Sequence, residues 1–90
     1  MYRLFLTKEF DRGLERISSR DRASIEKKIK EYMAPQLKNE PHYGTNIKKL
    51  KGYDPETWRY RIGYYRIFYI INEIEQDIQL ISIEQRKDAY

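Results

Sequence analysis

Hydrophobic residues in the first part of the chain recur three or four positions apart, which is the spacing of one face of a helix. The first predicted helix follows Thr7, which can cap it, and the second begins near Ser19 or Asp21, either of which can serve as its cap. Pro35 disfavours helical geometry at Ala34, so we expect the second helix to end there. The two apolar stripes are Phe10, Leu14 and Ile17, followed by Ile25, Ile29, Tyr32 and Met33.

The last third of the chain is rich in aromatic and β-branched residues, which in the segment 58–62 alternate with arginine. Alternation with a period of two is typical of half-buried strands. Gly63 and the short segment 72–76 mark turns, so the strands on either side of each turn should pair as antiparallel hairpins. With one more apolar segment at the start, the predicted strands cover residues 2–6, 58–62, 64–71 and 77–83.

The predicted elements follow the order β-α-α-β-β-β, with a loop over residues 36–45. Two helices cannot bury their apolar stripes on each other and also leave an apolar sheet bare. We therefore expect an α+β fold in which two N-terminal helices pack on one face of a small, mostly antiparallel β-sheet. The opposite face would then be free to bind a ligand. The length of 90 residues suits a single domain spanning residues 1–90.

The cysteine and histidine content excludes several kinds of site. A chain without cysteine has no disulfide, thiolate nucleophile or cysteine-based zinc site. The single histidine, His42, cannot supply a multi-histidine metal site or a pair of histidines for acid–base catalysis. It lies in the predicted loop, and we assign it no catalytic role. We expect a protein with no metal and no cofactor.

The hydropathy pattern contains no segment of membrane-spanning length. The longest apolar run, Ile67 to Ile71, is the size of a strand. The first ten residues lack the apolar core and the small-residue cleavage site of a signal peptide. The absence of cysteine is compatible with a reducing compartment, so we expect a cytoplasmic protein without membrane contacts.

Basic residues are concentrated in the middle of the chain. Residues 45–66 contain six Lys or Arg and two Asp or Glu, which gives a net charge of +4. Residues 67–90 contain two Lys or Arg and five Asp or Glu, which gives a net charge of −3. A concentrated basic segment attracts polyanions, and nucleic acid is the most common one. The alternative is an ordinary solvated charged surface.

Arginines interrupt two of the predicted strands. Arg59 and Arg61 alternate with apolar residues and therefore share one face of their strand. Arg66 lies within an apolar strand, where a buried unpaired charge would be costly, so its guanidinium must reach water or an anion. Whether Arg66 shares the face of the other two depends on the strand register across Gly63, which the sequence leaves open. The structural alternative is an ion pair with an acidic residue such as Glu73, Glu75 or Asp77.

Three short segments in residues 48–90 form a recognisable set. They read Lys-Leu-Lys-Gly at 49–52, Trp-Arg-Tyr-Arg-Ile-Gly-Tyr-Tyr-Arg at 58–66 and Ile-Ser-Ile-Glu-Gln-Arg at 81–86, and Tyr90 follows four residues later. At these spacings the set resembles the RelE/ParE superfamily of toxins from type II toxin–antitoxin systems, whose fold has the same element order. The resemblance to the RelE branch implies a ribosome-dependent endoribonuclease that cleaves mRNA in the A site and inhibits translation.

The same resemblance implies the residues and partners of the site. In the implied reaction an RNA 2′-hydroxyl attacks the adjacent phosphate, and Arg66 and Arg86 would stabilise the negative charge that develops. Gln85 departs from the pattern, because many relatives have histidine there. The partners implied are a cognate antitoxin protein, mRNA and the ribosome. The catalytic candidates are Arg59, Arg61, Arg66, Arg86 and Tyr90, and the candidate RNA or ribosome contacts are Lys48, Lys49 and Lys51.

Two other functions are compatible with these residues. One is a toxin of the ParE type, which poisons DNA gyrase and has no nuclease activity. The other is a catalytically silent module that keeps only antitoxin and nucleic-acid contacts. The basic strand residues together with Arg86 and Tyr90 favour the ribonuclease.

Overall fold

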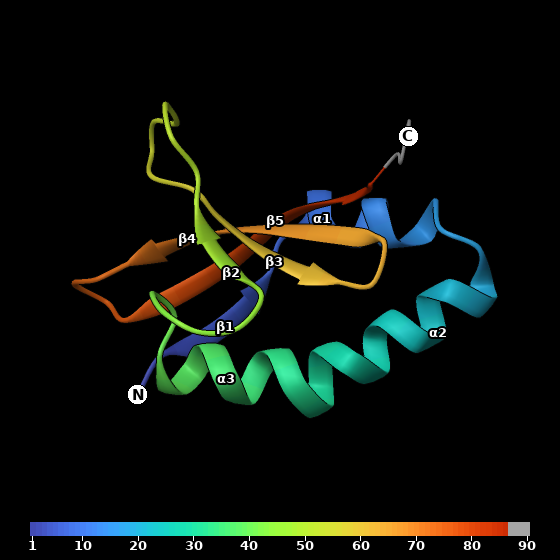
Figure 1. Ribbon diagram of the computed structural model, residues 1–90, viewed down its shortest axis with the longest axis horizontal. Helices are drawn as coiled ribbons and strands as arrows, with labels where there is room; N and C mark the ends of the chain where they lie inside the picture. The colour runs from blue at the N-terminus through green and yellow to red at the C-terminus, as the bar shows by residue number, and fades with distance from the viewer. Residues whose placement is uncertain (87–90) are drawn as a thin grey trace.

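A five-stranded sheet with helices on one of its faces makes up the computed structural model, which describes residues 1–86 (Figure 1). The spatial order of the strands is β1-β5-β4-β3-β2. β1 runs parallel to β5, and the other neighbouring pairs are antiparallel. This arrangement confirms the predicted α+β fold. The strands are β1 (Arg3–Leu6), β2 (Ile47–Lys49), β3 (Trp58–Ile62), β4 (Tyr65–Asn72) and β5 (Asp77–Gln85).

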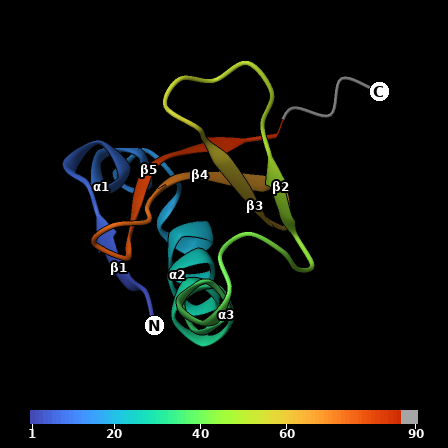
Figure 2. The same ribbon diagram turned by 90° about the vertical axis from the view of Figure 1, so that its left-hand side faces the viewer.

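The helical part of the chain lies between β1 and β2. Its elements are α1 (Lys8–Glu15), α2 (Ser19–Lys28), a π-helical turn (Ile29–Met33) and α3 (Ala34–Asn39). Thr7 caps α1 as predicted, since its Oγ1 accepts a hydrogen bond from the backbone N–H of Phe10 at 3.2 Å. Figure 2 looks nearly along α2 and α3, which continue each other beneath the sheet. Within residues 1–86, no helix combines the length and the apolar composition needed to cross a membrane.

The apolar core lies between the sheet and the helices. Alternate residues of β3 and β4 point into it, as the period of two in a strand requires. Tyr69 is fully buried, and its hydroxyl donates to the carbonyl oxygen of Pro41 at 2.8 Å, so its polar atom is satisfied. The other buried hydrophobic residues are Phe10, Leu14, Ile25, Ile29, Met33, Leu37, Trp58, Tyr60, Ile62, Tyr65, Ile67, Ile78 and Leu80.

The second helical segment is longer than predicted. The prediction that it ends at Ala34 is wrong, and residues 36–39, predicted as loop, belong to α3. The turn that precedes Pro35 is π-helical, and such a wider turn accommodates a residue that has a ring and no N–H. Leu37 is fully buried and gives the continued helix an apolar contact with the core. Burial of this side chain therefore outweighs the local preference of proline.

Two further expectations about this segment are corrected. The cap of α2 is Ser18, whose Oγ accepts a hydrogen bond from the backbone N–H of Asp21 at 3.2 Å, and not Ser19 or Asp21. The Asp21 carboxylate instead accepts a hydrogen bond from the Tyr65 hydroxyl at 2.8 Å. Tyr32, which was expected in the apolar stripe, is 64% exposed.

The predicted strands correspond to β1, β3, β4 and β5, but β2 was not predicted. It has three residues, two of which are exposed lysines, so no hydrophobic alternation reveals it. Pairing with β3 produces this strand: Ile47 lies opposite Tyr60, and Lys48 lies opposite Arg59. Lys48 is thereby aligned with the arginine-bearing face of β3.

Gly13 is a point of close approach between α1 and the sheet. A β-carbon added there would lie 2.8 Å from Cγ2 of Ile83 on β5, which is closer than carbon atoms pack. Helix propensity alone would make Gly13→Ala stabilising by about 1 kcal/mol. We expect instead that overpacking lowers the free energy of unfolding by about 1–3 kcal/mol, measured by urea denaturation.

A control for helix propensity is available on α2. Ser24 is exposed there, so Ser24→Ala changes the propensity without creating a contact with the sheet. It should leave the protein unchanged or slightly more stable. A Gly13→Ala protein at least as stable as the wild type would show that α1 can move away from β5 at little cost.

Candidate nucleic-acid interface

The sheet face that points away from the helices, called the open face below, carries three of the predicted catalytic arginines. Arg61 lies directly opposite Arg66 across the β3–β4 hairpin, and Arg59 lies opposite Phe68. The turn contains Gly63 with a φ of +56°, a conformation that glycine adopts without strain. The register that the sequence left open therefore places all three arginines on the same face.

Arg66 has an acidic partner, but not one of those expected. Its Nη2 donates to Oε1 of Glu84 at 3.3 Å, and its guanidinium carbon lies 6.0 Å from the centre of the Phe68 ring. Glu84 lies directly opposite Arg66 on β5. Of the acidic residues proposed from the sequence, Glu73 and Glu75 lie in the β4–β5 turn, and Asp77 begins β5 and pairs with Arg3 at 3.1 Å. Both side chains of the observed pair are substantially exposed, so the pair contributes little to stability.

The electrostatics of Arg59 show how closely the basic groups gather. Burial lowers the pKa of the Arg59 guanidinium below its usual value. The positive charges of Arg61, Arg66 and Arg86 lower it further. The backbone N–H of Arg86 donates to the carbonyl oxygen of Tyr64, which keeps the end of β5 beside the hairpin turn. Four of the five predicted catalytic residues are thus electrostatically coupled.

The remaining predicted site residues have different surroundings. Gln85 lies opposite Tyr65, a residue of the core, so it belongs to the helix face and not to the arginine group. Tyr90 lies outside the described residues. Lys48 is on the open face, opposite Arg59, and Lys51 is exposed in the loop between β2 and β3.

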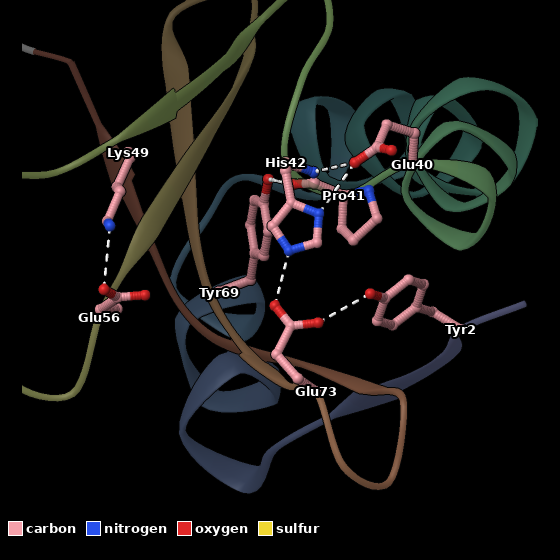
Figure 3. Close-up of polar contacts among 8 residues, drawn as sticks. All are labelled: Tyr2, Glu40, Pro41, His42, Lys49, Glu56, Tyr69 and Glu73. Carbon is pink, nitrogen blue, oxygen red and sulfur yellow. Dashed lines mark hydrogen bonds and ion pairs between the residues drawn. The ribbon is translucent and has the colours of Figure 1, made fainter.

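Lys49 is engaged in a structural contact. Its Nζ pairs with Oε2 of Glu56 at 2.9 Å (Figure 3). The same Nζ lies 5.8 Å from the centre of the Trp58 ring. It also lies opposite Trp58 in the strand pairing, on the side of the sheet that faces the helices. Of the three predicted lysines, Lys48 is therefore the one aligned with the open face.

A second cluster, centred on His42, joins segments that are distant in sequence (Figure 3). His42 Nδ1 lies 2.9 Å from Oε2 of Glu40, and Nε2 lies 2.6 Å from Oε2 of Glu73. The other oxygen of Glu73 accepts a hydrogen bond from the Tyr2 hydroxyl at 2.8 Å. Because both ring nitrogens face carboxylates, only the imidazolium form can donate both bonds. The cluster lies past the end of β4, whereas Arg66 lies near its start.

The whole-chain comparison identifies the family. The model of the family described as ParE toxin of type II toxin–antitoxin system, parDE, matches residues 4–90. The chain therefore belongs to this family, and it is a type II toxin of the RelE/ParE superfamily that its motifs resemble. No sequence among curated proteins matches it.

Solved toxin structures share the fold. A chain of the RelE–RelB complex from Pyrococcus horikoshii is 22% identical, with a TM-score of 0.71 over 98% of both chains. For the RelBE2 complex from Mycobacterium tuberculosis the identity is 24% and the TM-score 0.72, over 94% of this chain and 98% of that one. The YoeB/ParE toxin from Agrobacterium tumefaciens is 22% identical to this chain. Its TM-score is 0.71, over 94% of this chain and 99% of that one.

The His42 cluster makes a pH-dependent contribution to stability. Hydrogen bonding to Glu73 raises the pKa of His42 above its usual 6.5, and the bond to Glu40 acts in the same direction. The contribution of the histidine is therefore complete below pH 6.5 and is lost as the pH rises through the raised pKa. Hydrogen bonds from His42 lower the pKa values of both glutamates below 4.5, so their contribution is lost only as the pH falls below that value.

We expect His42→Gln to lower Tm more at pH ~6 than at pH ~8.5. Because the chain has a single histidine, NMR titration of its ring should give an unambiguous pKa above 6.5. Glu73→Gln should remove most of this upward shift, whereas Glu75→Gln, an exposed carboxylate in the same turn, should preserve it. An ordinary pKa for His42 in the wild-type protein would contradict the two ion pairs.

Proposed function

We propose that this toxin is a ribosome-dependent endoribonuclease whose active site is the arginine cluster of the open face. The observation that carries the proposal is the direct cross-strand pairing of Arg61 with Arg66, with Arg59 and Arg86 close by. Like charges on opposite strand positions destabilise a sheet. Glu84 offsets part of this charge at Arg66. A bound polyanion would relieve the remaining repulsion, and the RNA backbone is a polyanion.

The chemistry requires no metal ion. The 2′-oxygen of one nucleotide attacks the adjacent phosphorus, the bond from phosphorus to the 5′-oxygen breaks, and a 2′,3′-cyclic phosphate and a 5′-hydroxyl result. Guanidinium groups donate charge-assisted hydrogen bonds to the phosphoryl oxygens, where negative charge increases in the transition state. Arg66 and Arg86 are assigned this role.

The arginine cluster is better suited to stabilising negative charge than to transferring protons. The 2′-hydroxyl must lose a proton and the leaving oxygen must gain one, and arginine titrates far above neutrality. The lowered pKa of Arg59 brings that residue closer to this task. The candidates for proton transfer are Arg59, Arg61 and Tyr90. Weak acid–base groups suit an enzyme that relies on the ribosome to align its substrate, because alignment alone can supply a large part of the rate.

The partners follow from this assignment. Several of the similar solved structures are complexes of RelE with RelB or with a RelB peptide. We infer that a cognate antitoxin covers this toxin, and an acidic segment would complement the net charge of +4 of residues 45–66. On the ribosome, Lys48 and Lys51 would supply phosphate contacts with RNA, whereas Lys49 is already paired with Glu56. The protein would act in the cytoplasm, where ribosomes and mRNA are found.

A second candidate function is inhibition of DNA gyrase, which is favoured by the match to the ParE toxin family. In vitro translation followed by primer extension separates the possibilities. Cuts in phase with codons support the ribonuclease, whereas inhibition of DNA supercoiling without cuts supports the gyrase poison. A protein that does neither would be a binding module only.

We expect Arg66→Ala to reduce ribosome-dependent mRNA cleavage by about 10²–10³-fold, which is the usual cost of removing one donor to a developing oxyanion. Arg66→Lys should recover only part of the rate, because lysine lacks the two-pronged geometry of guanidinium. Since the ion pair with Glu84 is exposed, both variants should remain folded.

Arg20 provides the matched control for this experiment. It is an exposed arginine of α2, which lies on the helix side of the sheet. Arg20→Ala changes the net charge by the same amount and should cleave at the wild-type rate. Equal rates for Arg66→Ala and the wild-type toxin would exclude the open-face cluster as the active site.

A further inference from the structure

The loop between β2 and β3 stands beside the arginine cluster. In Figure 2 it rises from the sheet on the side away from α2 and α3. Its base is closed by a hydrogen bond from the backbone N–H of Leu50 to the carbonyl oxygen of Thr57 at 2.9 Å. The ion pair between Lys49 and Glu56, also 2.9 Å long, lies at the same place. These contacts join the two ends of the loop.

A hollow of about 270 Å³ lies where this loop meets β4 and β5. Leu50 and Tyr53 line it from the loop, and Phe68 lines it from β4. These three side chains form an apolar and largely aromatic part of a lining that is otherwise mostly polar. Its other lining residues are Thr57, Arg66, Ile81, Ser82 and Glu84. The hollow thus joins an aromatic wall to the guanidinium of Arg66.

We propose that this hollow, called the base pocket below, binds one unpaired nucleobase of a single-stranded RNA whose phosphates lie on the arginine cluster. The inference rests on the proposed function for the choice of RNA as the polyanion. Aromatic side chains next to a basic groove are the usual means of holding single-stranded nucleic acid, because every base can stack on a ring. A base inside a duplex is already stacked and could not enter.

The spacing along β4 supports this placement. Arg66 and Phe68 are two residues apart on one strand, so their side chains leave the same face about 7 Å apart. Phe68 also lies opposite Arg59. A phosphate on the guanidinium groups would therefore place the base of the same or the next nucleotide beside the ring. Ser82 and Glu84 offer a hydroxyl and a carboxylate for hydrogen bonds with the edge of the base.

Fluorescence anisotropy with a short, labelled single-stranded RNA tests the base pocket. We expect Tyr53→Ala to raise Kd by about tenfold or more, as loss of one stacking contact does. Tyr53→Phe keeps the ring and should bind as the wild type does. Tyr43→Ala is the matched control, because Tyr43 is exposed and does not line the hollow. Tyr53 is itself 55% exposed, so its removal should leave the core intact.

Two further readouts separate stacking from charge. The dependence of log Kd on log salt should be unchanged in Tyr53→Ala, whereas Arg61→Ala should reduce its slope by about 1. An RNA of the same length with abasic units has phosphates but no bases. It should bind equally to the wild-type protein and to Tyr53→Ala.

The outcomes distinguish this inference from the proposed function. If the wild-type protein binds the RNA through Tyr53 but never cleaves mRNA on the ribosome, the proposed function fails and the base pocket stands. If Tyr53→Ala binds RNA as tightly as Tyr43→Ala does, the base pocket is overturned whether or not cleavage occurs. A wild-type protein that does not bind the oligonucleotide, or a Tyr53 effect that persists with abasic RNA, overturns it as well.

Discussion

A one-residue bulge in β5 decides which side chains reach each face of the sheet. Partway along β4 the register against β5 shifts by one residue, with Ile81 as the extra residue. Regular pairing counted from the β4–β5 turn would place Ile83 opposite Arg66, whereas the bulge places Glu84 there. Ile83 lies instead toward the helices, against Gly13 of α1. Both the position of α1 and the partner of Arg66 depend on this shift.

The two faces of the sheet then serve different purposes. Burial of each large apolar side chain on the helix face stabilises the fold by about 1.5–3 kcal/mol. A like-charged cross-strand pair on the open face costs about 0.2–1 kcal/mol, which is less than one such burial. The core can therefore support clustered arginines that do not help the protein to fold. A bound polyanion would add favourable interactions to those that the cluster already makes with Glu84, which is the physical basis of the proposed ligand.

Much of this arrangement could be predicted from local patterns. Hydrophobic periodicity located α1, α2 and the longer strands, and strict alternation placed Arg59 and Arg61 on one face. The errors in the extent and number of the elements occurred where the contacts that decide the conformation are distant in sequence. Leu37 is buried by tertiary packing, which extends the helix past Pro35, and β2 exists because it pairs with β3. Neither effect has a local signal.

The sequence by itself determined the first two helices and the four longer strands, and it placed Arg59 and Arg61 on one face, because these follow from side-chain chemistry and periodicity. Only the tertiary structure decided that Arg66 joins Arg61, that Glu84 is its partner and that the loop carrying Tyr53 stands over Phe68. Those relations depend on strand register and on a bulge, and a shift of one residue moves a side chain to the opposite face. No local pattern in the sequence specifies that shift.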